Sequence, residues 1–118
     1  MQILEELNKD IDRLSLDLRG FIKQNVVDFK KRGVVLGVSG GVDSAVTLTL
    51  SVQELGAENV YALLLPEKES ASSSTPLGAE ICESLGVQYE EVPISPMLES
   101  LDIYNKKDQV IKRACPEY

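Results

Sequence analysis

The hexapeptide Ser-Gly-Gly-Val-Asp-Ser at residues 39–44 constrains the fold most strongly, because it joins an apolar run to a helix-like run. The preceding residues 34–38 read as a strand, and the following residues 45–55 read as a helix. A strand that turns through two glycines into a helix presents backbone N–H groups at the helix N-terminus, which suits a phosphate. Because Gly40 and Gly41 lack a Cβ atom, the backbone there can take a positive φ and approach a ligand closely.

Three side chains of the hexapeptide add chemistry to this backbone site. Ser39 and Ser44 supply hydroxyl donors, whereas Asp43 places a carboxylate where a phosphate would be repelled. That carboxylate is explained if a divalent cation bridges the two groups, since Mg²⁺ binds through one or two carboxylates together with substrate phosphates. The loop differs from GxxxxGK[ST], because no lysine follows the glycines. The alternative is a plain Gly-Gly turn in which Asp43 only favours the first turn of the next helix.

The chain alternates between strand-like and helix-like runs on both sides of residue 60. Strands are predicted at 33–38, 60–65 and 87–92, and helices at 42–55 and 76–85. Gly56 and Gly86 should end the two helices, and Thr75 should cap the second helix with Pro76 at its first position. Consecutive strand–helix–strand units imply a parallel sheet. The predicted fold class is therefore α/β, an open parallel sheet with helices on both faces and strands buried on both sides.

The two ends of the chain read as helical extensions of this core, which spans 33–93. An amphipathic helix is predicted over 1–32, and its apolar stripe is expected to pack on the sheet. The stripe consists of Leu7, Ile11, Leu14, Leu18, Phe21 or Ile22, and Val26. Gly33 is a plausible stop after the cations at 30–32. In the tail, 94–118, the pattern of apolar residues predicts one short helix near 97–104 and another turn or two near 108–114.

Composition limits the classes of protein to consider. A chain of 118 residues corresponds to one domain, 1–118, and its net charge of −7 argues weakly against a nucleic-acid partner. No apolar run is long enough to span a membrane, and the acidic start at 1–6 does not resemble a signal peptide, so a cytoplasmic location is expected. Histidine is absent, and Cys82 and Cys115 form no metal or disulfide pattern. Cys82 is expected to be a buried apolar residue.

The hexapeptide matches SGGxDS and resembles the pyrophosphate-binding loop of the ATP pyrophosphatases, also called PP-loop enzymes. Its flanks are similar to those of NAD synthetases over about 12–104. The matching segments are 21–50, Leu65-Pro66, 79–87 and 92–96. This resemblance implies a Rossmann-like, adenine nucleotide alpha-hydrolase-like domain with three strands of a sheet that normally has five. A chain that is incomplete at its C-terminus is therefore expected, with the first strand left as an edge.

The resemblance also implies a reaction. A substrate carboxylate attacks the α-phosphate of ATP, pyrophosphate leaves, and ammonia displaces AMP. The substrates would be ATP, deamido-NAD and ammonia, with Mg²⁺ held by Asp43, and the protein would be a homodimer. No side-chain nucleophile is required, so no catalytic residue is assigned. The implied ATP-binding residues are Gly37, Val38, Ser39, Gly40, Gly41, Val42, Asp43, Ser44 and Leu65.

Three alternatives stay open at this point. Another amidotransferase-type ligase with the same loop would act on a different carboxylate or carbonyl. A tRNA-modifying enzyme would need catalytic cysteines and a basic surface, and neither is visible in the sequence. A module that binds ATP without catalysis would keep the loop and lack the chemistry. The chain also departs from the family pattern at Pro76-Leu77, which stand where acidic residues are usual.

Overall fold

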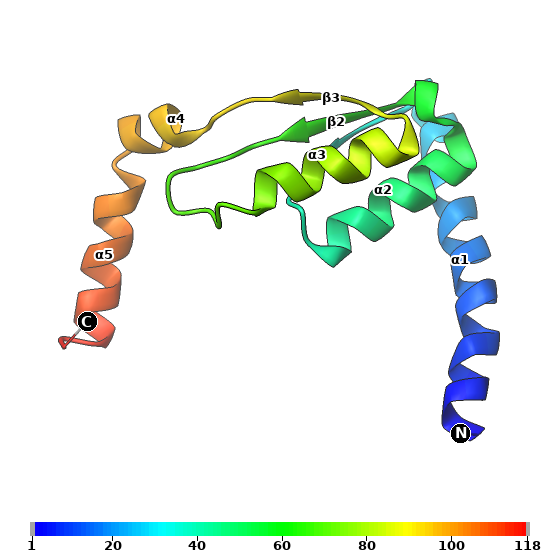
Figure 1. The fold of residues 1–118 in the computed structure, drawn as a ribbon, viewed down its shortest axis with the longest axis horizontal. Coiled ribbons are helices and arrows are strands. Elements are labelled where there is room, and N and C mark those ends of the chain that lie inside the picture. Colours follow the sequence, from blue (N-terminus) through cyan, green and yellow to red (C-terminus); the bar gives the residue numbers. More distant parts are fainter. Residues whose placement is uncertain (1, 118) are drawn as a thin grey trace.

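The computed structural model describes residues 2–117, apart from the side chains of Gln2, Ile3, Leu7 and Lys9. Helices and strands alternate along the chain, with a long helix at one end and two helices at the other (Figure 1). The elements are α1 (Gln2–Asp28), β1 (Val34–Gly37), α2 (Val42–Leu55), the 3₁₀ turn η1 (Ala57–Asn59), β2 (Val60–Leu64), α3 (Ser74–Leu85), β3 (Gln88–Glu91), α4 (Ser95–Ser100) and α5 (Ile103–Ala114).

The three strands form one parallel sheet in the order β1-β2-β3. Val34 lies opposite Val60 at the start of the first pair, and Tyr61 lies opposite Gln88 in the second. This topology confirms the predicted open parallel sheet flanked by helices. Within the described residues β1 has a neighbour on one side only, so it is an edge strand, as predicted. Because all three strands are parallel, their carboxyl ends lie at the same edge of the sheet.

Helices α2 and α3 pack on one face of the sheet and enclose the core (Figure 1). The buried core residues are Val38, Leu48, Val60, Ala62, Leu64, Cys82 and Val87. Cys82 is fully buried, as predicted. The prediction of strands buried on both faces is wrong for β1, since Val35 is 65% exposed and the strand alternates between half-buried and exposed residues. Helix α2 is exposed at its start, where Val42 and Val46 face solvent.

The glycines predicted the ends of α2 and α3 correctly, whereas the start of α3 differs from the prediction. Helix α2 has the predicted bounds, and Gly56 and Gly86 end α2 and α3 with φ angles of 83° and 69°. Helix α3 begins at Ser74 after Ser73, so the prediction of Thr75 as N-cap is wrong. Pro76 is therefore the third residue of α3, so its prediction at the first helical position is also wrong. It still lies in the first turn, where the missing N–H costs no hydrogen bond because this turn has no acceptor for it.

Helix α1 ends earlier than predicted, through a turn that the sequence did not signal. Lys31 N–H donates to Val26 O and Lys30 N–H donates to Val27 O, both at 2.9 Å, which is the Schellman pattern. Lys30 takes the left-handed conformation at φ 54°, a role that glycine usually fills. Gly33 therefore lies beyond the helix end, and the chain leaves α1 at Asp28.

The prediction that the α1 stripe packs on the sheet is wrong for most of its described members. Ile11, Leu14 and Phe21 are 55%, 56% and 67% exposed, and Leu7 lies outside the described side chains. Helix α1 instead contacts α2, where Arg19 Nε lies 3.1 Å from Glu54 Oε2. Of the stripe, Ile22 and Val26 are half-buried, as is Arg19.

The C-terminal tail is more helical than predicted. Helix α5 runs for 12 residues, so the prediction of a turn or two is wrong, and its polar stretch 105–108 is exposed on the helix surface. Asp102, at φ 56°, separates α4 from α5. Helices α1 and α5 project from opposite ends of the sheet (Figure 1). The radius of gyration is accordingly 18.4 Å, against about 13.5 Å expected for a compact chain of this length.

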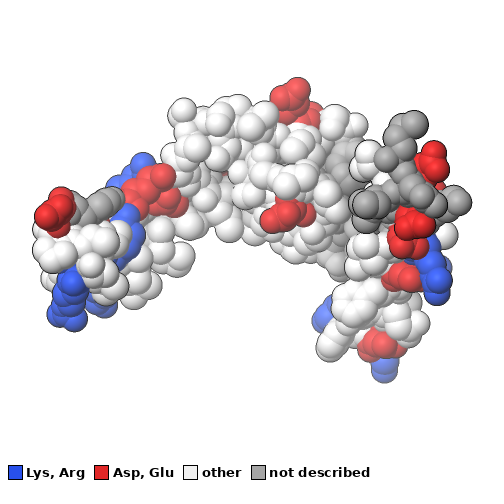
Figure 2. Space-filling view, turned by 90° about the horizontal axis from the view of Figure 1, so that it is seen from below, with Lys and Arg blue, Asp and Glu red and all other residues white. Residues whose placement is uncertain are grey.

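Charged side chains concentrate on the projecting helices. Figure 2 shows lysine, arginine and acidic groups over α1 and α5, with a mostly uncharged surface between them. The cations in this view form two separate groups rather than one basic stripe. No helix in the described part of the chain has both the length and the apolar character needed to cross a bilayer.

Candidate functional site

The glycine loop, residues 38–41, carries the chain from the carboxyl end of β1 into α2. Val38 is buried, and its N–H donates to Leu63 O at 2.9 Å, so the loop starts anchored to β2. Gly41 is the N-cap of α2, with φ −88° and ψ 169°. The first-turn N–H groups of α2 consequently point toward the loop without intrahelical partners, as at any helix start. This end of α2 is the positive end of the helix dipole.

Gly40 is required by both its conformation and its surroundings. Its φ is 81°, and a Cβ atom there would lie 2.3 Å from the backbone oxygen of Ser74 at the start of α3. A second glycine, Gly78 of α3, is buried, and a Cβ on it would lie 2.9 Å from Leu64 Cδ2. The two glycines let α3 approach the ends of β1 and β2 closely. The positive φ of Gly40 was predicted from the sequence, but its contact with α3 was not.

The two serines of the hexapeptide hold the glycine loop closed with their own hydroxyl groups. Ser39 N–H donates to Ser44 Oγ at 3.1 Å, and Gly41 N–H donates to Ser39 Oγ at 3.2 Å. The two hydroxyl oxygens lie 3.1 Å apart, and Ser44 Oγ also donates to Gly41 O at 3.3 Å. The two hydroxyls and two loop N–H groups are therefore bonded to one another, which fixes the course of the loop at the start of α2.

Asp43 lies in the first turn of α2 with its side chain exposed. Among residues 2–117 no three Asp, Glu, His or Cys side chains gather in a way that could hold a metal ion. A divalent cation at Asp43 would therefore take its other ligands from a bound phosphate and water, which is the usual arrangement for Mg²⁺. The single carboxylate beside a phosphate-type loop fits that mode of binding.

A cavity of about 190 Å³ opens beside the glycine loop, between the carboxyl ends of β1 and β2. Its walls are partly apolar and partly hydroxyl-bearing. The lining residues are Val38, Ser39, Leu64, Leu65, Pro66, Ser70, Ala71, Ser74 and Thr75. Of the nine residues implied as an ATP site, Val38, Ser39 and Leu65 line this cavity, and residues 40–44 form the adjoining loop and helix start. Gly37 lies in β1, one residue before the loop.

The serine loop, residues 65–73, forms the far wall of the same cavity. Four of its members line the cavity, namely Leu65, Pro66, Ser70 and Ala71. Glu67, just behind the wall, accepts hydrogen bonds from Tyr104 Oη at 2.6 Å and from Ser70 Oγ at 3.1 Å. The hydrogen bond from Tyr104, followed by that from the Glu69 N–H, lowers the pKa of the Glu67 carboxyl. Sequence reasoning missed Glu67 and Tyr104, which lie 37 residues apart and share no motif.

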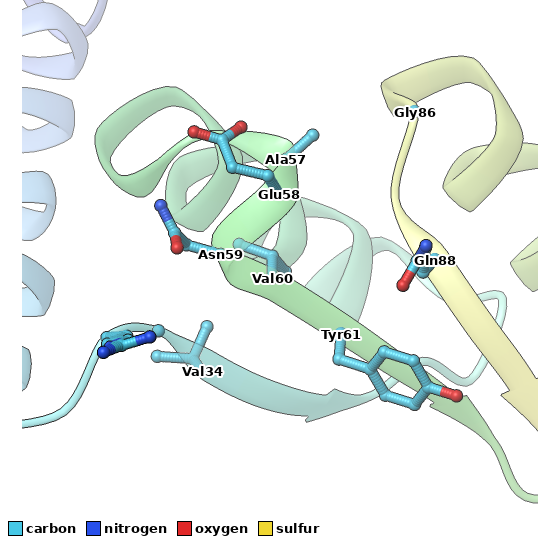
Figure 3. Close-up of a pocket in the computed structure, with 10 residues that line it drawn as sticks. Val34, Ala57, Glu58, Asn59, Val60, Tyr61, Gly86 and Gln88 are labelled. Carbon is cyan, nitrogen blue, oxygen red and sulfur yellow. The ribbon is translucent and has the colours of Figure 1, made fainter.

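The departure at Pro76-Leu77 lies next to the cavity rather than in its wall. Thr75 lines the cavity, whereas Leu77 is exposed in the first turn of α3. A larger hollow of about 760 Å³ lies at the opposite end of the sheet, around Val34, Asn59, Tyr61 and Gln88 (Figure 3). It surrounds the amino ends of the strands, whereas ligands of open α/β sheets bind at the carboxyl ends. The smaller cavity is therefore the candidate site.

The family model and the curated relatives that match this chain point to the same family. The family model for NAD synthase matches residues 15–114. An NH(3)-dependent NAD(+) synthetase from Thermotoga maritima is 43% identical over 103 residues, which cover 81% of this chain and 37% of that protein. The chain thus spans about a third of the length of the curated relatives that it matches.

Two solved structures extend the similarity to the fold. The NH3-dependent NAD synthetase from Campylobacter jejuni, in complex with a nitrate ion, has a TM-score of 0.70 and 32% identity, covering 76% of this chain and 39% of that one. The glutamine-dependent NAD+ synthetase from Acinetobacter baumannii, in complex with ADP, has a TM-score of 0.58 and 33% identity, covering 70% and 14%. On the match over residues 15–114, this chain belongs to the NAD synthase family.

Proposed function

We propose that the glycine loop and the adjoining cavity bind ATP, and that the protein adenylates a carboxylate and then amidates it with ammonia. The observation that carries this proposal is the preorganised loop at the N-terminus of α2, with Ser39 bridging the loop and the cavity wall. The cavity volume of about 190 Å³ is below the roughly 300–1,000 Å³ of a typical ligand site. It therefore takes one part of the nucleotide, and we assign the adenine to it, against Leu65.

The phosphates then lie over the glycine loop and the start of α2. Attack on the α-phosphate leaves negative charge on the departing pyrophosphate, and catalysis requires donors that already point at that charge. The N–H groups of the first turn of α2 supply these donors, and the hydroxyls of Ser39 and Ser44 join them when they exchange their bonds within the loop for bonds to the phosphate. Mg²⁺, when bound through Asp43, would neutralise part of the phosphate charge. Residues 39–44 thus stabilise the leaving group and hold the phosphates in line.

No side chain of the described chain needs to act as a nucleophile in this reaction. Cys82 is buried against the core, and burial raises the pKa of its thiol, so it is an unreactive structural cysteine. Adenylation needs no general base, because the carboxylate that attacks is already ionised at neutral pH. When ammonia then displaces AMP, the proton lost by the attacking nitrogen passes to solvent. The protein's contribution is therefore positioning and charge stabilisation.

The acceptor that we propose is deamido-NAD, with ammonia as the nitrogen source, following the activity named for the relatives. A homodimer in the cytoplasm with small-molecule partners only, and no nucleic acid or membrane, stays a prediction of the family resemblance. The separated cation groups over α1 and α5 favour small-molecule substrates over a nucleic acid (Figure 2).

Pyrophosphate release from ATP tests the proposal. The longest natural form of the polypeptide is offered ATP, Mg²⁺, deamido-NAD and ammonia, and Asp43→Ala is compared with Asp17→Ala, an exposed aspartate of α1. We expect release that depends on deamido-NAD, a fall of about 100-fold or more in Asp43→Ala, and no change in Asp17→Ala. ATP binding without release would favour a non-catalytic module, and release with another carboxylate would favour a different ligase. Equal rates in the two variants would remove Asp43 from the site.

A further inference from the structure

The serine loop has hydrogen bonds within residues 67–70, and it is also tied to helices α4 and α5. Its backbone leaves β2 beside the segment that leads into α4, where Val92 N–H donates to Leu64 O at 2.8 Å and Ile94 N–H donates to Pro66 O at 3.0 Å. Lys68 N–H then donates to Ser95 Oγ at 2.8 Å. Three successive points of attachment therefore continue the β2–β3 pairing past the ends of the strands and onto α4.

Glu67 is the centre of the attachment to α5. Its carboxylate accepts from Tyr104 Oη at 2.6 Å, from Glu69 N–H at 3.1 Å and from Ser70 Oγ at 3.1 Å. Ser70 lines the cavity, so only two hydrogen bonds separate the Tyr104 hydroxyl from the cavity wall. Hydrogen bonds to a carboxylate are stronger than those between neutral groups, which makes this the firmest link between the loop and α5.

Charged groups reinforce the same link from both sides. Lys68 Nζ lies 3.8 Å from the centre of the Tyr104 ring and 3.3 Å from Glu99 Oε1. Lys107 of α5 forms an ion pair with Glu69. Exposed ion pairs contribute little individually, but here three consecutive loop residues, 67–69, each bond to a residue of α4 or α5. The contacts therefore fix the course of the loop rather than one side chain of it.

We propose that Tyr104 is a positioning residue that, through Glu67, holds the serine loop against the cavity and so sets the affinity of the site for its nucleotide. The inference rests on the proposed function, because it assumes that the cavity takes part of ATP. Ordering a loop residue costs roughly 1–2 kcal/mol of backbone entropy. A loop that is ordered before the ligand arrives does not impose that cost on binding.

Removing one hydroxyl group tests this inference. Tyr104→Phe deletes the donor to Glu67 and keeps the ring under Lys68. Tyr89→Phe is the matched control, because Tyr89 Oη donates to Glu83 at 2.7 Å and neither residue lines the cavity. In the longest natural form of the polypeptide we expect Tyr104→Phe to weaken MgATP binding, measured by calorimetry, about 5-fold. The KM for ATP should rise while kcat stays within about 2-fold, and the amides of residues 68–70 should exchange hydrogen faster.

Each outcome separates this inference from the proposed function. Equal MgATP affinity in Tyr104→Phe and the unchanged protein would overturn the inference, whatever happens to amide exchange. An equal loss in Tyr104→Phe and Tyr89→Phe would also overturn it, since the effect would then be general destabilisation. Absence of MgATP binding by the unchanged protein would overturn the proposed function, and this inference with it. A loss of affinity confined to Tyr104→Phe, with a melting temperature no lower than that of Tyr89→Phe, is the supporting result.

Discussion

The glycine loop and the serine loop occupy equivalent places in the fold, but only the serine loop is also tied by side chains to distant helices. Each leaves the carboxyl end of a parallel strand, leads into a helix on the same face of the sheet and borders the same cavity. The side-chain hydrogen bonds of the glycine loop join residues two to five positions apart. Those that tie the serine loop to α4 and α5 join residues 27 to 38 positions apart.

The glycine loop is therefore held by neighbours in sequence, whereas the serine loop also depends on tertiary contacts. The glycine loop forms whenever β1 and α2 form, because all of its side-chain partners lie within residues 39–44. The serine loop has bonds of its own within residues 67–70, but its ties to α4 and α5 form only once those helices have docked, which closes a much longer stretch of chain. We therefore expect the phosphate side of the cavity to be rigid and the serine-loop side to be the mobile one.

The largest expected effect comes from Gly40→Ala in the glycine loop. An alanine at φ 81° costs about 1–2 kcal/mol, and its Cβ would meet the Ser74 oxygen at 2.3 Å. Because backbone rather than a flexible side chain must move, we expect a total loss of about 3 kcal/mol in the free energy of unfolding. Urea denaturation measures this loss, and MgATP binding should fall with it.

Gly20→Ala is the matched control for that substitution. Gly20 lies inside α1, where an added Cβ would meet nothing within 4 Å. Alanine is the better helix former by about 0.5–1 kcal/mol, so this variant should be slightly more stable than the unchanged chain. If Gly40→Ala were as stable as Gly20→Ala, the glycine loop would be more adaptable than its hydrogen bonds indicate, and the contrast between the two loops would fail.

A smaller effect is expected from Ser44→Ala, which tests the local closure of the glycine loop. The change removes the acceptor of Ser39 N–H and the donor to Gly41 O. We expect a loss of about 1 kcal/mol in stability and faster amide exchange at Ser39. Ser84→Ala is the control, since Ser84 Oγ also donates to a carbonyl three residues earlier, at 2.8 Å from Ile81 O, but accepts no loop amide. Loosening of the serine loop by Ser44→Ala would show that the two loops are not independent.

The same contrast explains how much of the molecule the sequence predicted. The bounds of α2, the glycines that end α2 and α3, and the parallel order of the strands were predicted because local patterns decide them. The residues of the glycine loop were identified for the same reason. Their placement beside Val38 and Leu65 in one cavity followed from the rule that ligands bind at strand carboxyl ends.

The features that the sequence did not predict depend on partners far along the chain. Tyr104 and Glu67 carry no motif, and only the docking of α5 brings them together. Helix α1 was expected to use its apolar stripe, yet its contact with α2 includes a bond between Arg19 and Glu54, which lie 35 residues apart. Its end was misplaced because Lys30 adopts a conformation that usually marks glycine. Periodicity identifies an apolar face of a helix but not the surface that meets it.

The smallest expected effect is a difference between the two loops in their response to acid. The pKa of Glu67 is lowered in the folded chain, first by the Tyr104 hydroxyl and next by the Glu69 N–H. A carboxylate with a lowered folded-state pKa stabilises the structure fully above its unfolded pKa of about 4.3, and this contribution is lost as the pH falls through the folded value. The serine loop should therefore lose its anchor in acid. The glycine loop should keep its closure, because serine hydroxyls and backbone amides hold it.

NMR titration from neutral pH to acid would detect this separation residue by residue. The amide resonances of Glu69 and Ser70 should move together as Glu67 takes up a proton, while those of Ser39 and Gly41 should not follow that midpoint. Lys107, Lys68 and the carboxylate of Glu69 also lie near Glu67, so the assignment needs Glu67→Gln, in which the shared transition should disappear. A common midpoint for all four amides would mean that the loops respond as one unit. In that case the hydrogen bonds that close the glycine loop would depend on the docking of α5, and local closure would not be what makes the phosphate side of the cavity rigid.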